Sequence, residues 1–165
     1  EMEGYPDTME PLSHPALVSR VGEELLPFAK AKDMTLHWNL AEPVTVTGNA
    51  SLLEKVVHNL LSNAIRHAPS GAPVWVTLSA QFLRVESSGV RIPEEDLPFL
   101  FTPFYRVEKS RNKATGGSGL GLYLVHAIAT MHGFSCQIQN TDRGVAATLR
   151  FSPQPDRASC AANQK

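Results

Sequence analysis

The stretch from residue 51 to residue 67, SLLEKVVHNLLSNAIRH, limits what this chain can fold into more than any other. Its apolar residues recur at helical spacing and form one broad stripe: Leu53, Val56, Val57, Leu60, Leu61, Ala64 and Ile65. Asn49 or Ser51 can cap its start, and Pro-Ser-Gly at 69–71 ends it. A helix with so wide an apolar face needs a broad apolar surface, such as a sheet, to cover it.

Short segments rich in β-branched and aromatic residues can supply that sheet. They are residues 35–40, 44–47, 73–80, 82–87, 135–140 and 145–151. We predict two further helices, one from Pro15 to about Ala29 and one from Gly119 to a stop at Gly133, and a helical turn at 94–100. This order predicts an α/β two-layer sandwich, with a mixed sheet of about five strands and three helices on one face.

A chain of 165 residues is long enough for one domain with a single core. Residues 1–14 carry prolines and acids with little periodicity and are expected to be an N-terminal segment. Residues 153–165 have the composition of a disordered tail. The sequence therefore predicts one folded domain over residues 15–152.

Charge and cysteine usage exclude several classes of protein. The formal net charge is −1 and the charged residues are scattered, so neither nucleic acid nor an anionic membrane is an expected partner. No apolar run approaches the roughly 18 to 20 residues of a bilayer-spanning helix, so no direct membrane contact is expected. Cys136 and Cys160 form no CxxC or Cys/His cluster, which favours a reducing compartment without a metal–thiolate site.

Asn59 and Asn63 stand one turn apart in the predicted helix at 51–67, and Arg66 and His67 extend their stripe. Asparagine is a poor residue for a helix interior, because its amide competes for backbone hydrogen bonds. One interpretation is a pair of buried amides that bond neighbouring loops. The other is an Mg²⁺ site, since amide oxygens suit this hard cation and its remaining positions take phosphate oxygens and water. Arg66 would then face the same phosphates.

The stretch TGGSGLGLYLV at 115–125 has four glycines that lead into an apolar helix. Glycine brings backbone N–H groups close to an anion at a helix N-terminus, where the helix dipole favours negative charge. A flexible hinge is the alternative. The stretch lacks the GKS or GKT of a Walker loop and does not directly follow a strand, as a Rossmann loop would.

These segments come in a specific order: the Asn-bearing helix, a strand with ESSGVRIP, then FTPFYR, then GGSGLGL and its helix. In this order the chain resembles the catalytic and ATP-binding domain of bacterial sensor histidine kinases. These domains belong to an ATPase superfamily that also contains the gyrase B subunit and the MutL mismatch-repair proteins. The resemblance covers residues 17–151 and implies the Bergerat α/β sandwich, which agrees with the architecture predicted above.

The resemblance assigns roles by position and implies ATP and Mg²⁺ as ligands. In the N box, Asn63 is the expected Mg²⁺ ligand and Asn59 a second candidate, Arg66 lies near the phosphates, and His67 falls beside adenine. In the G2 box the glycines approach the triphosphate, and the ATP-binding residues are Gly117, Ser118, Gly119, Leu120, Gly121 and Leu122. The F box spans residues 101–104, where Phe104 either contacts the nucleotide or packs the base of a lid. Arg106, Arg111 and Lys113 lie in this lid and either close over phosphates or remain solvated.

The G1 box of the family reads Asp-x-Gly-x-Gly-Ile, and its Asp accepts a hydrogen bond from the adenine amine. Here the turn from 87 to 92, called the G1 turn below, carries Ser87, Gly89 and Ile92 at the adenine side, with Arg91 in place of the second glycine. A bond to a charged group is worth about 1.5 to 3 kcal/mol, against about 1 for a neutral one. We therefore expect ATP affinity about tenfold to a hundredfold lower and less selectivity for adenine, with the phosphate side intact.

The family also needs a phospho-acceptor histidine on a dimerising helix hairpin. His14 is the tempting candidate, but Pro15 follows it directly and no hairpin surrounds it. The resemblance thus implies a monomeric cytoplasmic domain cut from a longer kinase in the bacterial inner membrane, with residues 1–14 ending a linker. Its partners would be the dimerisation and phospho-acceptor domain of the same protein and the receiver domain of a response regulator.

The expected function is transfer of the ATP γ-phosphate to a histidine on that separate domain. A self-contained ATPase or serine kinase of the superfamily would carry a carboxylate at position 59, and an amide cannot act as a general base. A pseudokinase that serves as an interaction module is the third reading, because the G1 turn is degenerate.

Overall fold

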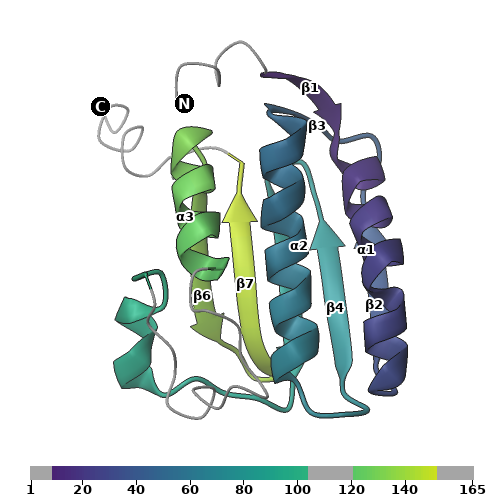
Figure 1. Cartoon of the computed structure of the whole chain (residues 1–165), viewed down its shortest axis with the longest axis vertical. Coiled ribbons are helices and arrows are strands. Elements are labelled where there is room, and N and C mark those ends of the chain that lie inside the picture. Colours follow the sequence, from purple (N-terminus) through teal and green to yellow (C-terminus); the bar gives the residue numbers. More distant parts are fainter. Residues whose placement is uncertain (1–8, 104–120, 152–165) are drawn as a thin grey trace.

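The computed structural model describes residues 9–103 and 121–151. Figure 1 shows a sheet covered on one side by three long helices. The helices are α1 (His14–Ala31), α2 (Ala50–His67) and α3 (Gly121–Met131), with a short 3₁₀-helix η3 (Glu94–Phe99). The strands are β1 (Glu10–Ser13), β2 (Thr35–Leu40), β3 (Thr45–Gly48), β4 (Pro73–Leu78), β5 (Phe82–Ser88), β6 (Ser135–Asn140) and β7 (Gly144–Arg150).

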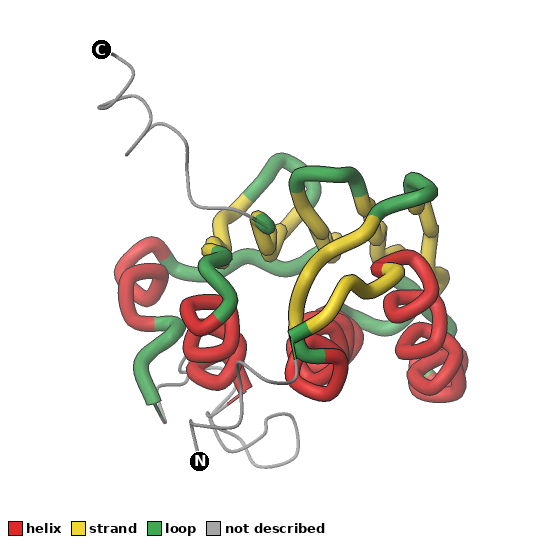
Figure 2. Tube along the Cα trace, turned by 90° about the horizontal axis from the view of Figure 1, so that it is seen from above, coloured by secondary structure: helices red, strands yellow, loops and turns green. Residues whose placement is uncertain are grey.

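Five of the strands form one mixed sheet in the order β2-β4-β5-β7-β6. β2 runs parallel to β4, and the other three neighbouring pairs are antiparallel. Figure 2 shows the three long helices on one side of these strands. The predicted α/β two-layer sandwich is therefore confirmed. No helix in the described part of the chain combines the length and hydropathy that a bilayer-crossing segment requires.

The core fills the space between the two layers, and α2 lies at its centre. Strands β4 and β5 alternate buried and partly exposed residues, as expected for a sheet with one covered face. The residues of α2 that pack on this face are those of the predicted apolar stripe: Leu53, Val56, Val57, Leu60, Leu61 and Ile65 are all at most 4% exposed. The residues that recur at helical spacing in the sequence thus form the buried face of α2.

Both ends of α2 are held by side chains. At the start, Asn49 accepts a hydrogen bond from Leu52 N at 3.0 Å, so the predicted cap is Asn49. The backbone N–H of Asn49 donates to His132 Nε2, which ties the end of α3 to this cap. At the C-terminal end of α2, the Lys32 ammonium donates to the carbonyls of Ile65 (2.7 Å), Arg66 (3.1 Å) and Ala68 (2.8 Å). A cation there also opposes the negative end of the helix dipole.

Regular structure begins earlier than predicted. Residues 10–13 form β1, which pairs antiparallel with β3 in a second, two-stranded sheet. Ser13 precedes α1 without a side-chain cap, and His14 is the first helical residue. The expectation of structure from residue 15 failed because the four residues EPLS contain a proline and show no alternation of their own. Their partner strand lies more than thirty residues further along the chain.

His14 is fully buried, and its ring meets Phe151 edge to face at a centroid distance of 4.9 Å. Neither ring nitrogen has a hydrogen-bond partner among the residues that the structure describes. Burial lowers the pKa of His14 from 6.5 to about 4, so the imidazole is neutral at pH 7. The residue therefore serves as an apolar ring at the start of α1 and is inaccessible as a phospho-acceptor, as its sequence context indicated.

This burial predicts an acid-sensitive fold. Between pH 6.5 and 4 the unfolded chain binds a proton that the folded chain does not, so stability is full above 6.5 and falls toward 4. We expect the free energy of unfolding to drop by about 2 kcal/mol from this residue between pH 7 and pH 5. His14→Phe should remove that part of the drop, as measured by urea denaturation at both pH values. Thr35→Ser, at an exposed position of β2, is the control and should leave the drop unchanged. Equal drops in the parent chain and His14→Phe would contradict the assignment.

Candidate functional site

Asn59 and Asn63 lie one turn apart on α2, and both are half-buried. The Asn59 amide donates to the carbonyl of Lys55 at 2.9 Å. The Oδ1 of Asn63 accepts a hydrogen bond from the Arg66 guanidinium. Both bonds lie within α2, so among the described residues these two contacts do not distinguish the Mg²⁺ role from the role of bonding a neighbouring loop. Asn59, Asn63 and Arg66 therefore form a local polar strip beside the buried apolar face of α2.

Arg66 and His67, the last residues of α2, are both exposed. The Arg66 side chain occupies the oxygen that the sequence assigns to Mg²⁺, although an amide oxygen has two lone pairs and can accept twice. A divalent cation at Asn63 would repel the guanidinium. Arg66 would then be displaced towards anionic groups bound nearby.

The start of α3 lies against Asn59. A Cβ built on Gly121 would come within 2.9 Å of Asn59 Oδ1, which is closer than real Cβ atoms approach other atoms. Glycine at 121 thus allows the N-terminus of α3 and the amide of Asn59 to meet. Two segments that lie about sixty residues apart, the N box and the end of the glycine-rich stretch, are brought together in this way.

The G1 turn follows β5. Ser87 is 6% exposed and lies on the same side of β5 as the buried Leu83 and Val85, facing the helices. Gly89 has φ +78°, and a Cβ there would lie 2.8 Å from the Pro69 ring just after α2. This position therefore needs glycine, both for its backbone conformation and for its contact with the end of α2.

Arg91, which replaces the second glycine of the family pattern, is exposed and lies 4.0 Å from Glu94. Asp33 is the one non-glycine residue with positive φ in the described part of the chain. Position 91 therefore makes no demand for glycine in this turn, and the arginine fits without backbone strain.

The β6–β7 turn (residues 140–144) holds the G1 turn in place through hydrogen bonds. The sequence did not predict this contact. Asn140 Oδ1 accepts from Ile92 N at 2.9 Å, and Asn140 Nδ2 donates to Ile92 O at 2.8 Å. Gly89 N donates to the carbonyl of Arg143 at 3.3 Å. In the sequence, an asparagine at the end of a strand is simply an ordinary turn residue, so only the fold identifies its partner.

Several predicted site residues lie outside the described residues: Phe104, Arg106, Arg111, Lys113, Gly117, Ser118, Gly119 and Leu120. Leu122, on α3, is partly buried and packs against the core. Phe101, at the start of the F box, is half-buried and its ring lies 5.4 Å from that of His126 on α3. This contact fits the packing role weighed for the F box.

A protein-family model described as "Histidine kinase-, DNA gyrase B-, and HSP90-like ATPase" matches residues 48–156, which is more than half of the chain. The chain belongs to this ATPase family. The match begins at the end of β3 and contains α2, the G1 turn, α3 and the last two strands. The predicted resemblance to histidine-kinase ATP-binding domains is thereby confirmed.

Its relatives include bacterial sensor kinases. The sensor histidine kinase YkoH of Bacillus subtilis is 36% identical over 118 residues, which make up 68% of this chain and 26% of YkoH. The probable sensor kinase SilS of Salmonella typhimurium is 36% identical over 127 residues, or 74% of this chain and 25% of SilS. The chain therefore spans about a quarter of the length of these relatives.

Solved structures show the same fold. The catalytic domain of histidine kinase ThkA superposes with a TM-score of 0.78 at 21% identity, over 90% of this chain and 97% of that domain. The mycobacterial sensor histidine kinase MprB superposes with a TM-score of 0.73 at 24% identity, over 88% and 99%. At these identities the superpositions establish the fold, and they agree with the predicted Bergerat sandwich.

The contact between Asn59 and Gly121 predicts a non-additive pair of substitutions. Gly121→Ala should lower the free energy of unfolding by about 1 to 2 kcal/mol, because its methyl group overpacks against the amide. In an Asn59→Ala background the same change should be neutral or stabilising by up to about 1 kcal/mol, since alanine favours a helix. Urea denaturation of the four chains in this cycle measures the coupling. An equal effect of Gly121→Ala in both backgrounds would show that the contact is not what excludes a side chain.

Proposed function

We propose that the chain is the ATP-binding catalytic domain of a sensor histidine kinase and transfers the ATP γ-phosphate to a histidine on a separate domain. The observation that carries this proposal is the meeting of the Asn59–Asn63 strip with the N-terminus of α3. The amide oxygens on one side can bind a metal ion. The helix N-terminus on the other side can bind phosphate. Catalysis would consist mainly of positioning and charge neutralisation.

A histidine acceptor suits this site better than water or a serine. Asn59 stands where ATPases and serine kinases of the superfamily have a carboxylate, and its amide NH₂ is engaged with the Lys55 carbonyl. An amide cannot take a proton from water or a hydroxyl at neutral pH. An imidazole is a competent nucleophile without such a base, so the transfer to histidine is the reaction that this residue set supports.

The ligands proposed here are Mg²⁺ and ATP. Mg²⁺ would bind Asn63, with Asn59 as a second candidate, and would keep phosphate oxygens and water in its remaining positions. Adenine would lie at the G1 turn beside Ser87, Gly89 and Ile92. The proximity of Pro69 to Gly89 supports this layout, because it places the end of α2 next to that turn.

The proposed partners are the dimerisation and phospho-acceptor domain of the same protein and the receiver domain of a response regulator. The relatives YkoH and SilS are sensor kinases of which this chain matches one part, which supports a longer protein around it. We propose that this domain works in the bacterial cytoplasm and that the full-length protein lies in the inner membrane.

The decisive experiment mixes this chain with the phospho-acceptor helix hairpin of its own full-length protein, Mg²⁺ and γ-labelled ATP. We expect acid-labile, base-stable label on the hairpin, and at least a hundredfold less with Asn63→Ala, about the loss of one key stabilising contact. His58→Ala is the matched control, since it changes an exposed residue of α2 outside the polar strip. ATP binding without any transfer would favour the interaction-module reading, and hydrolysis without transfer would favour an ATPase.

The serine in the G1 turn predicts a gain of affinity on substitution. Ser87→Asp should restore a charged acceptor for the adenine amine and tighten Mg·ATP binding about tenfold, while Mg·GTP binding stays as it is. The control is Ser88→Asp, which adds the same charge on the opposite side of β5 and should change neither. Isothermal titration calorimetry measures the affinities of the parent chain and both variants for each of the two nucleotides. Equal tightening in both variants would mean that only net charge matters at this end of the sheet.

A further inference from the structure

The G1 turn is fixed at its far end by a single side chain from another strand. Asn140, the last residue of β6, bonds both the N–H and the C=O of Ile92, at 2.9 and 2.8 Å. Two opposed hydrogen bonds from one planar amide imitate the pairing of a neighbouring strand. The position and orientation of the Ile92 backbone are therefore set by Asn140.

The near end of the same turn is held by the backbone of the β6–β7 turn. Gly89 N donates to the Arg143 carbonyl, and Ser88 pairs with Gly144 in the register of β5 and β7. A Cβ on Gly144 would come within 2.1 Å of Ser87 O, so the backbones of β5 and β7 lie too close there for a side chain at position 144. Both ends of the G1 turn thus rest on residues 140–144.

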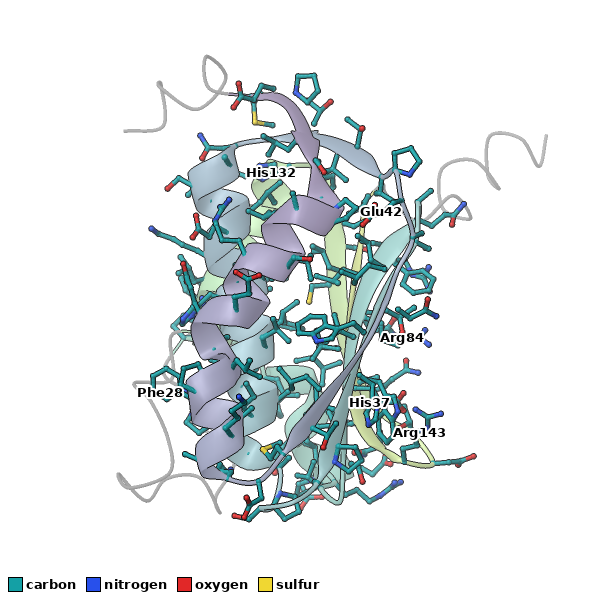
Figure 3. All side chains as sticks on the ribbon, turned by 90° about the vertical axis from the view of Figure 1, so that its right-hand side faces the viewer. Phe28, His37, Glu42, Arg84, His132 and Arg143 are labelled. Carbon is teal, nitrogen blue, oxygen red and sulfur yellow. The ribbon has the colours of Figure 1, made fainter. Side chains whose placement is uncertain are left out.

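The β6–β7 turn is itself anchored on the sheet face that carries no helix. The Arg143 guanidinium lies 4.0 Å from the centre of the Trp75 ring and 3.9 Å from Glu86 Oε1. Thr141 Oγ1 donates to Glu86 Oε2 at 2.7 Å and accepts from Gly144 N at 3.0 Å. In Figure 3, Arg143, Arg84 and His37 lie together on this side of the sheet, away from the helices.

We infer that Asn140 is a positioning residue for nucleotide binding, which holds the G1 turn in the shape that receives the base of ATP. The inference rests on the proposed function. With Ser87 in place of a carboxylate, the remaining base contacts depend more on the backbone and apolar groups of the turn. If the G1 turn has its binding shape for only a fraction of the time, the apparent affinity for ATP falls by that fraction. A preorganised turn therefore matters more in this chain than in one with a carboxylate at position 87.

The test compares ATP with inorganic tripolyphosphate, both with Mg²⁺. Asn140→Ala should weaken ATP binding about five- to tenfold, as expected for the loss of two neutral hydrogen bonds. Tripolyphosphate affinity should not change, because that ligand has no base. Asn140→Asp keeps the side-chain volume but faces the Ile92 carbonyl with an acceptor, so it should behave like Asn140→Ala and substitutes for it if the alanine chain does not fold.

Arg143→Ala and Arg84→Ala form a matched pair on the helix-free face. Arg143 anchors the β6–β7 turn, whereas Arg84 bonds Thr148 Oγ1 at 3.3 Å and stacks on Phe82, away from that turn. Arg143→Ala should lower ATP affinity two- to threefold, about the effect of one exposed cation–π contact. Arg84→Ala should leave both affinities unchanged.

A second readout needs no nucleotide. The Ile92 amide proton should exchange with solvent at least tenfold faster in Asn140→Ala, because its acceptor is gone, while the amides of β4 should keep their rates. Failure of the parent chain to bind ATP would refute the proposed function and this role together. Three results would refute the positioning role alone, provided that the parent chain binds ATP. Asn140→Ala could weaken the binding of ATP and of tripolyphosphate equally, it could weaken neither, or it could leave the exchange rate of the Ile92 amide unchanged.

Discussion

The burial of α2 against the sheet is the contact on which the rest of the structure depends. Its apolar stripe leaves the helix no freedom to rotate, because turning it would expose that stripe to water. Its ends leave it no freedom to slide, since Asn49 and His132 fix the start and the Lys32 ammonium binds three carbonyls at the finish. Asn59 and Asn63 therefore stay in one place relative to the sheet, although their hydrogen bonds to other described residues are local ones within α2.

From this fixed helix the candidate site is assembled out of segments that are remote in sequence. Figure 1 shows the C-terminal end of α2 at the end of the sheet where β6 and β7 join. Pro69 meets Gly89 there, and Gly121 meets Asn59 about two turns back along the helix. Each meeting depends on a glycine that leaves space for a side chain of the partner segment. Within residues 9–103 and 121–151, the candidate site is thus defined by close contacts between backbone and side chain.

Local pattern was enough to predict most of this fold, because each long element has its own period. The stripe of α2 and the alternation of β4 and β5 depend on neighbours two to four residues apart, and the structure follows them. What could not be predicted depends on distant partners. β1 is a strand only because β3 lies beside it, and Asn140 is distinguished from any other turn asparagine only by Ile92, 48 positions away. The burial of His14 likewise depends on Phe151, near the other end of the domain.

The G1 turn departs from the family pattern at two positions, 87 and 91, and the two departures have different physical consequences. The missing glycine at position 91 concerns backbone shape, and the shape is maintained: Arg91 is exposed, its φ is not positive, and the turn is braced at Gly89 and Ile92 by the β6–β7 turn. The missing carboxylate at position 87 concerns chemistry, because a serine hydroxyl carries no negative charge. Ser87 faces the helices from a nearly buried position, where a neutral hydroxyl is inexpensive to desolvate but is a weaker acceptor than a carboxylate. The G1 turn therefore has the backbone frame of the family pattern without its charge, and under the proposed function we expect weaker recognition of the base.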